Sequence, residues 1–262
     1  VCGGTVTVFC QYIGPDAAAC IGAMVESGRN RRPYLLLCDM TEPAQWAMAV
    51  AGPETICCGD EQHMADLQLF LQKSGNASTY KPQLISYGGK LLYAESFFPA
   101  SRAFIFGGGH VGTALAPVLA SVGFRVVVYD NRPDFAKPDH YPSAEQVILG
   151  DYLDIGAHLT LTENDYVCIM TPGHQADCEV LLQALRSPAT YIGCIGSRHK
   201  IAATNAYLMA NGIPEADLSR VHAPIGLEIY GQTPAEISVS VAAEMIRHRA
   251  LRAGTDKKPS KR

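Results

Sequence analysis

Residues 104–130 read FIFGGGHVGTALAPVLASVGFRVVVYD, and this stretch decides the fold class. Its apolar start predicts a buried strand over 103–106, and the segment after the glycines predicts a helix over 110–122. A second strand, rich in valine, is expected over 125–129. A GxGxxG that follows a strand and opens a helix is the context in which a glycine-rich loop binds a dinucleotide.

Three glycines of this loop have separate predicted roles. Gly107 allows the tight turn, Gly109 lets a pyrophosphate approach the backbone, and Gly112 lets the helix pack on the sheet. Asp130 ends the second strand, 18 residues after Gly112, near where a carboxylate meets the ribose hydroxyls. Arg132 is close enough to receive a 2′-phosphate, so NAD and NADP both remain open.

The start of the predicted helix completes this cofactor site. The free N–H groups there, together with the positive end of the helix dipole, are expected to face an anion. Gly108, His110 and Val111 are therefore predicted to be cofactor-binding residues as well. Pro117 lies inside the helix and is expected to kink it. The alternative interpretation is a tight strand-to-helix turn that serves packing alone.

Strands and helices continue to alternate after this motif. Short strands are expected over 146–149, 166–170 and 190–192, and helices over 175–186 and 198–211. Such alternation indicates a parallel sheet with helices on both faces. A last helix is expected to begin at Thr-Pro-Ala-Glu (233–236), which reads as a capping box with proline at the first helical position.

The first part of the chain has a different, mixed character. The expected elements are helices over 16–28 and 60–72, strands over 5–10, 34–38 and 54–58, and a hairpin over 83–94 around Gly88-Gly89. Residues 96–102 look like a connector. We therefore predict an α/β protein with a small α/β domain over 1–98 and a Rossmann-like doubly wound domain over 99–262.

Composition excludes several classes of protein. The chain has 262 residues, of which 48% are hydrophobic and 18% charged, so it is not disordered. The net charge of −4 argues against a nucleic-acid partner. No apolar run is long enough for a transmembrane helix, so no membrane partner is expected. The nine cysteines form no CxxC pair and no secretory signal is visible, which favours free thiols in a cytoplasmic protein.

A second polar loop is expected at the carboxyl end of the strand at 166–170, where ligands bind in doubly wound sheets. His174 follows this strand and is placed to transfer protons, with Asp177 nearby in sequence. A surface histidine without a role is the alternative. No second ligand stands at metal-binding spacing beside His174, so no metal site is predicted.

A third loop carries positive charge at a helix start. Ser197 is a natural N-cap, and Arg198 and Lys200 stand in the first helical turn, where cations oppose the helix dipole. A bound phosphate or carboxylate would offset this unfavourable interaction between the cations and the helix dipole. The alternative is a basic helix end that is only solvated. Near the start of the chain, Cys2 beside two glycines has a thiol that can carry sulfur or bind a soft metal; a passive cysteine is the alternative.

These motifs together resemble the XdhC/CoxI family, accessory proteins of molybdenum hydroxylases such as xanthine dehydrogenase. The matching stretches are 104–136, TPGHQAD (171–177), YIGCIGSRHK (191–200), PIGLEIYGQTPAEISVSVAAEMI (224–246) and, more loosely, CGGTVTVF (2–9). Two departures stand out. Relatives usually carry more chain before the CGG segment, so either this sequence is incomplete or part of the first domain is missing. TPGH also differs from the more usual TH-type sequence, which weakens a transfer of function to His174.

The resemblance implies a function. It implies binding of molybdenum cofactor (molybdopterin), assistance with its sulfuration, and its insertion into a molybdenum hydroxylase client, with Cys2 in a cofactor- or sulfur-handling position. A cysteine desulfurase and a second copy of the chain are further partners expected on this view. The alternatives are an NAD(P)-dependent oxidoreductase, with His174 as proton donor, and a nucleotide-sensing binding protein. Molybdopterin and NAD(P) both carry phosphate groups that suit the glycine loop, so the sequence leaves this choice open.

Overall fold

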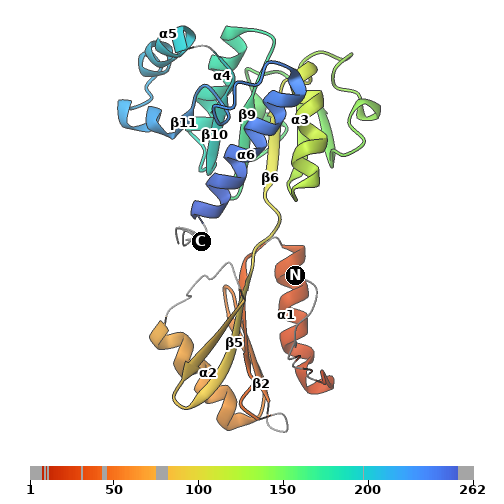
Figure 1. Cartoon of the computed structure of the whole chain (residues 1–262), viewed down its shortest axis with the longest axis vertical. Helices are drawn as coiled ribbons and strands as arrows, with labels where there is room; N and C mark the ends of the chain where they lie inside the picture. Colours follow the sequence, from red (N-terminus) through yellow and green to blue (C-terminus); the bar gives the residue numbers. More distant parts are fainter. Residues whose placement is uncertain are drawn as a thin grey trace. The chain divides into compact units, whose positions relative to one another are not determined.

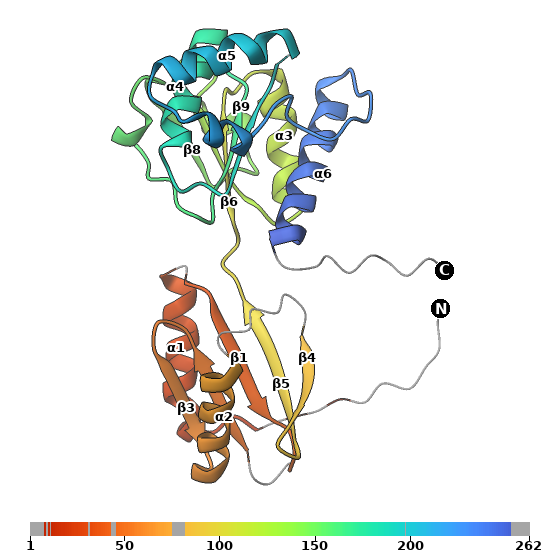
Figure 2. The same cartoon turned by 90° about the vertical axis from the view of Figure 1, so that its left-hand side faces the viewer.

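The computed structural model describes residues 8, 10, 12–30, 32–42, 46–74, 82–196 and 198–252, with Arg198 and His199 described by their backbone alone. The chain divides into two compact units (Figures 1 and 2). The first comprises residues 1–99 with 251–262, and the second comprises residues 100–250. No helix in the described part of the chain has the length and apolar character needed to cross a membrane.

The first unit is an antiparallel sheet with a helix on each face. Its strands β1 (Tyr34–Asp39), β2 (Ala47–Ala51), β3 (Thr55–Gly59), β4 (Gln83–Tyr87) and β5 (Lys90–Phe97) follow the spatial order β3-β2-β1-β5-β4. Helix α1 (Ala18–Arg29) follows a short 3-10 turn at Pro15–Ala17, and α2 (Glu61–Ser74) follows β3.

Alternation along the strands produces two separate cores in this unit. Leu35 and Leu37 of β1 point to one face, where they cluster with Leu67 and Phe70 of α2. The intervening side chains belong to the other face, where Cys20 of α1 packs with residues of β2 and β3. The predicted helices and the β4–β5 hairpin are present, whereas β2 was not predicted. The strand expected over 5–10 falls mostly outside the described residues.

The second unit is a parallel six-stranded sheet. Its elements are β6 (Arg102–Phe106), α3 (His110–Ser121), β7 (Arg125–Asp130), β8 (Gln146–Leu149), β9 (Tyr166–Ile169), α4 (His174–Leu185), β10 (Tyr191–Cys194), α5 (Arg198–Ala210), β11 (Val221–His222) and α6 (Pro234–Arg252), with 3-10 turns at Pro138–His140, Ile155–Ala157 and Glu215–Arg220. The strand order β11-β10-β9-β6-β7-β8 is that of a doubly wound Rossmann sheet, which confirms the predicted fold class.

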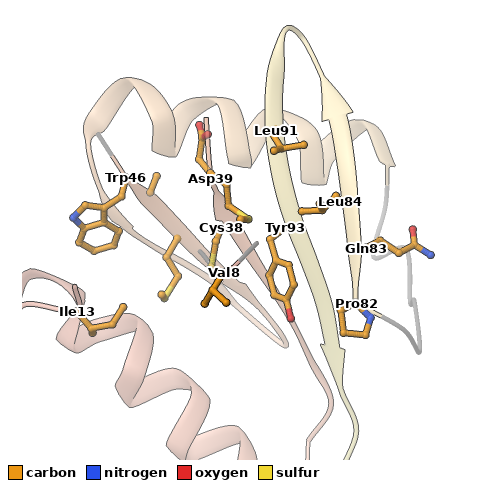
Figure 3. Close-up of a pocket in the computed structure, with 13 residues that line it drawn as sticks. Val8, Ile13, Cys38, Asp39, Trp46, Pro82, Gln83, Leu84, Leu91 and Tyr93 are labelled. Carbon is orange, nitrogen blue, oxygen red and sulfur yellow. The ribbon is translucent and has the colours of Figure 1, made fainter. Parts of the chain in front are cut away.

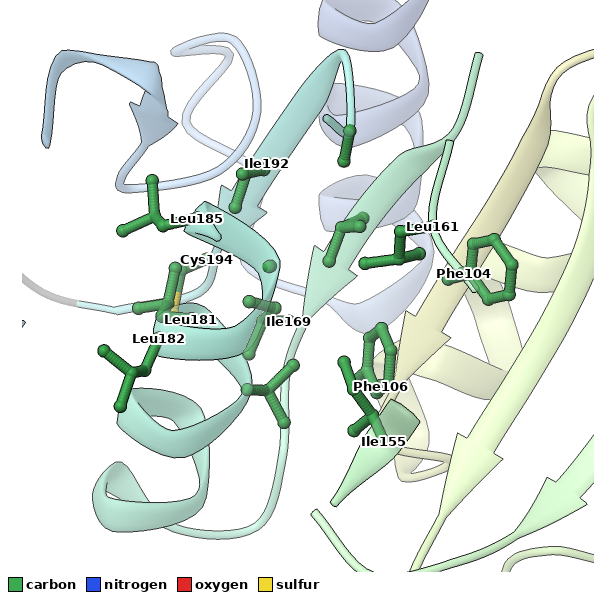
Figure 4. Close-up of a cluster of buried hydrophobic side chains, with 14 of the residues drawn as sticks. Phe104, Phe106, Ile155, Leu161, Ile169, Leu181, Leu182, Leu185, Ile192 and Cys194 are labelled. Atoms are coloured by element: carbon green, nitrogen blue, oxygen red, sulfur yellow. The ribbon is translucent and has the colours of Figure 1, made fainter. Parts of the chain in front are cut away.

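Both faces of this sheet are covered. Phe104 and Phe106 of β6 point to the side of α4 and belong to the same core as Leu181 and Leu185 of that helix (Figure 4). Ile105, between them in sequence, belongs to the opposite core with residues of α3 and α6. Strands buried on both faces explain why their sequences are continuously apolar. Helix α3 continues from His110 to Ser121 with Pro117 inside it.

Two features fix the last helix. The Thr233 N–H donates to Oε2 of Glu236 over 2.9 Å, and the Glu236 N–H donates to Oγ1 of Thr233 over 3.3 Å, so the predicted capping box is confirmed. Further along α6, Glu244 accepts hydrogen bonds from the Tyr191 hydroxyl (2.6 Å) and the Gly226 N–H (2.8 Å). It also lies 3.2 Å from Nδ1 of His222 on β11.

This arrangement predicts a pH dependence of stability. Burial alone raises the pKa of Glu244, but the contacts with His222, Tyr191 and Gly226 outweigh it and lower the pKa to about 2. Ionised Glu244 therefore stabilises the fold above the unfolded pKa, and this contribution is lost as the pH falls toward the folded pKa. Glu244→Gln should lower the free energy of unfolding by about 2 kcal/mol at neutral pH, with the difference vanishing in acid. Denaturant titrations of both proteins from neutral pH down toward the folded pKa of about 2 check the prediction. A difference in unfolding free energy that stays constant with pH would contradict it.

Candidate functional site

The glycine loop joins β6 to α3 at the point where the strand order reverses. Strands β7 and β8 lie on one side of β6, and β9, β10 and β11 lie on the other. Ligands of open α/β sheets bind in the crevice outside the carboxyl ends of the strands at such a switch point. The glycine loop and the loop that leads to His174, the first residue of α4, follow adjacent strands, β6 and β9.

Three of the four glycines are needed for packing. Gly107 has a φ of +113°, and a Cβ there would overlap the carbonyl oxygen of Met170. A Cβ at Gly112 would overlap the carbonyl oxygen of Gly107, so this glycine lets α3 approach the turn as the spacing predicts. Gly108 is enclosed by Tyr141, whose hydroxyl oxygen lies 2.7 Å from its carbonyl oxygen.

Gly109 differs from these because it borders open space. No atom would lie within 4 Å of a Cβ at this position. Gly109 is the N-cap of α3 and makes no side-chain cap, and its carbonyl accepts the first helical hydrogen bond, from the Thr113 N–H over 2.9 Å. The N–H groups of His110 and Val111 precede that bond and lie at the positive end of the helix dipole. This is the part of the loop that an anionic group can approach.

Asp130 and Arg132 bind each other. Asp130 is fully buried; its Oδ1 accepts from the backbone N and Nε of Arg132, and its Oδ2 accepts from Nη2 of Arg132 (2.8 Å) and from the Gly108 N–H (2.7 Å). Burial alone raises the pKa of Asp130, but these bonds outweigh it and hold the pKa below its usual value. The guanidinium also stacks on the ring of Phe135, 3.7 Å from its centroid. The carboxylate expected to bind a ribose is thus already engaged.

The structure brings His174 and Lys200 to the same small cavity. It lies beyond the carboxyl end of β10 and is also lined by Asp177 and Cys194. Asp177 accepts from the Thr171 hydroxyl (2.6 Å) and the Thr171 N–H (3.0 Å), and burial raises its pKa. Asp177 is more central to this cavity than sequence reasoning suggested, because its carboxylate fixes the loop after β9.

Other predicted site residues lie beyond what the structure describes. Ser197 and Cys2 are outside the described residues, and the side chain of Arg198 is not described. Within the described part of the chain, no group of three or more His, Cys, Asp or Glu side chains is placed to hold a metal ion.

The cavity carries a prediction about charge. Lys200 lowers the pKa of Asp177, in opposition to the larger effect of burial. Lys200→Ala should therefore raise the pKa of Asp177 further, and it should weaken phosphate binding about three- to tenfold if this helix start binds an anion. Carbon-detected NMR of the carboxyl group and phosphate titration measure the two effects. An unchanged Asp177 titration would contradict the electrostatic coupling, and unchanged phosphate affinity would contradict the anion site.

Comparison with known protein families shows to which family the chain belongs. A family model, the XdhC Rossmann domain, matches residues 103–245. The chain belongs to the XdhC family. The match includes the glycine loop, the loop with His174, the basic start of α5 and most of α6.

Two individual relatives are similar to the chain over part of its length. An uncharacterised protein of Escherichia coli K12, YqeB, is 30% identical over 146 residues, which is 55% of this chain and 27% of YqeB. A probable xanthine dehydrogenase subunit of Bacillus subtilis is 29% identical over 158 residues, 60% of this chain and 46% of that protein. The chain thus spans between about a quarter and about half of the lengths of these two relatives.

A solved structure shares the fold. The crystal structure of a xanthine dehydrogenase from Bacillus halodurans superposes with a TM-score of 0.72 and 22% sequence identity. The superposition covers 94% of this chain and 71% of that one. The likeness therefore extends beyond the XdhC Rossmann domain to the smaller unit.

Proposed function

We propose that this chain is an accessory protein that binds molybdenum cofactor and assists its sulfuration and insertion into a molybdenum hydroxylase such as xanthine dehydrogenase. The observation that carries the proposal is the open face of Gly109 at the uncapped start of α3, within an XdhC Rossmann domain. The name of the Bacillus subtilis relative, a probable xanthine dehydrogenase subunit, supports the choice of client.

The residues present fit the anionic end of this cofactor. Molybdopterin carries a phosphate, or a pyrophosphate in its dinucleotide forms, and such groups bind to backbone N–H donors at a helix start. Gly109, His110 and Val111 would hold that end. The bound cofactor would supply the molybdenum centre, whereas the protein binds it, orients it and limits its contact with water.

An NAD(P)-dependent oxidoreductase is the second candidate, and Asp130 at the end of β7 is the observation that favours it. Both oxygens of that carboxylate already accept hydrogen bonds from Arg132. A ribose would have to displace the guanidinium before it could bind there. A ligand held mainly through its phosphate needs no such exchange, which is why the maturation role is preferred.

Delivery to a client tests the proposal. The protein, purified anaerobically from cells that make molybdenum cofactor, is mixed with a cofactor-free xanthine dehydrogenase, and hydroxylase activity is followed. We expect the hydroxylase to become active and to be retained on the immobilised protein. A cysteine desulfurase in the mixture should increase the hydroxylase activity. Turnover of NAD(P)H with carbonyl compounds, abolished by His174→Ala, combined with no activation, would instead favour the oxidoreductase.

A further inference from the structure

A large cavity of the first unit lies over one face of its antiparallel sheet. Among the described residues, helix α1 makes its main contacts on β2 and β3, and the cavity lies over side chains of β1, β5 and β4. The cavity there has a volume of about 750 Å³ (Figure 3). Small-molecule sites usually have volumes of about 300–1,000 Å³ and mostly apolar linings.

The strand register sets a row of side chains along the floor of this groove. Cys38 of β1 pairs with Met48 of β2 on one side and with Tyr93 of β5 on the other, and Tyr93 pairs in turn with Leu84 of β4. Paired residues of adjacent strands point to the same face, so these four side chains form one row across the sheet. Leu84 forms one end of the row, and Trp46 lies beside the other end (Figure 3).

The lining carries little charge. No Lys, Arg or His is among the described residues that line the groove, and Asp39 is its only ionisable carboxyl. That carboxylate is already bound by Thr41, His63 and Lys90, at 2.5, 2.8 and 3.1 Å from their side chains. A phosphate or another anion would find no cation in this lining.

The remaining polar groups are neutral. The Tyr93 hydroxyl donates to Glu95 over 2.5 Å, and this bond, more than burial, raises the pKa of Tyr93 to about 12. Burial and the nearby Glu95 raise the pKa of Cys38 to about 11, so its thiol stays protonated. The Tyr93 oxygen is left as an acceptor beside the apolar floor.

We propose that this groove binds a neutral, planar aromatic or heteroaromatic small molecule, stacked on the row of Met48, Cys38 and Tyr93 and flanked by Trp46. A planar ring can lie along one row of side chains, and thioether and aromatic side chains favour contact with π-systems. No Lys, Arg or His among the described lining residues attracts an anion. The groove belongs to the first unit and does not depend on the glycine loop of the second.

The protein contains its own reporter for this test, because Trp46 is the one tryptophan of the chain. The whole chain is titrated near neutral pH with lumichrome and with lumazine, two neutral planar heterocycles, and tryptophan fluorescence is recorded. We expect saturable quenching by at least one of them, unaffected by an excess of inorganic pyrophosphate. Absence of saturable quenching with both probes would overturn the proposal, as would full competition by pyrophosphate.

A matched pair of variants tests whether the probe binds in the groove. Leu84 in the groove is 62% exposed and Leu69 on α2 is 41% exposed, so glutamate at either position should leave the fold intact. Leu84→Glu should weaken probe binding at least tenfold, while Leu69→Glu should leave it within about twofold of the original. Equal affinity in the two variants would show adsorption elsewhere and overturn the proposal. Because cofactor delivery is measured separately, either proposal can fail while the other stands.

Discussion

Gly107→Ala is expected to destabilise the Rossmann unit by about 4 kcal/mol. A side chain at φ +113° is strained by roughly 1–3 kcal/mol, and its Cβ would overlap the backbone oxygen of Met170, which cannot rotate away. Such a loss is a large fraction of the stability of a domain. Chemical denaturation followed by far-UV circular dichroism measures it.

Gly123→Ala is the matched control for this change. Gly123 has a φ of +86°, yet nothing would lie within 4 Å of a Cβ there. It therefore carries the backbone strain without the steric overlap, and its expected cost is about 1 kcal/mol. Equal costs at the two positions would contradict the close approach of the loop after β9 to the glycine turn.

Gly109→Ala should have the opposite profile, with stability kept and anion binding lost. The new methyl group meets no protein atom, but it occupies the space from which a pyrophosphate would reach the N–H groups of α3. We expect the affinity for inorganic pyrophosphate to fall by one to two orders of magnitude, or about 1.4–3 kcal/mol, with no decrease in the thermal midpoint. Isothermal titration calorimetry and a thermal melt give the two quantities.

Gly22→Ala provides the comparison for that experiment. Gly22 lies in α1, and a Cβ there also has open space around it. The substitution adds the same methyl group at a position far in sequence from the glycine loop, so it should leave the affinity for pyrophosphate unchanged. If Gly109→Ala binds pyrophosphate as well as Gly22→Ala does, the glycine loop is not the anion site.

Much of the Rossmann unit could be predicted from sequence because its signals are local. Apolar strands buried on both faces, helices of regular length and a capping box at 233–236 each depend on residues close together in the chain. Strand β2 was missed because its sequence, AMAVA, has little preference for strands. All five of its residues are buried between β1 and β3, so tertiary packing decides its structure. Strand β11 has two residues and depends on its pairing with β10.

The candidate site also combines features that the sequence predicts with features that it does not. The roles of Gly107 and Gly112 follow from their spacing, and both positions pack as expected. The closure of Tyr141 over Gly108 joins residues 33 positions apart, and nothing in the local sequence indicates it. Asp130 and Arg132 were both identified, but their side chains bind each other, which residue types and spacing alone cannot show. The groove of the first unit arises from strand register and has no sequence motif.

Cofactor content is the most direct test of the central claim, that the glycine loop holds molybdenum cofactor. The original protein, Gly109→Ala and Gly22→Ala are purified anaerobically from cells that make the cofactor, and molybdenum and pterin are quantified per chain. We expect both components in stoichiometric ratio in the original protein and in Gly22→Ala, and a loss of at least tenfold in Gly109→Ala. Equal molybdenum and pterin in all three proteins, or none in the original, would contradict the account.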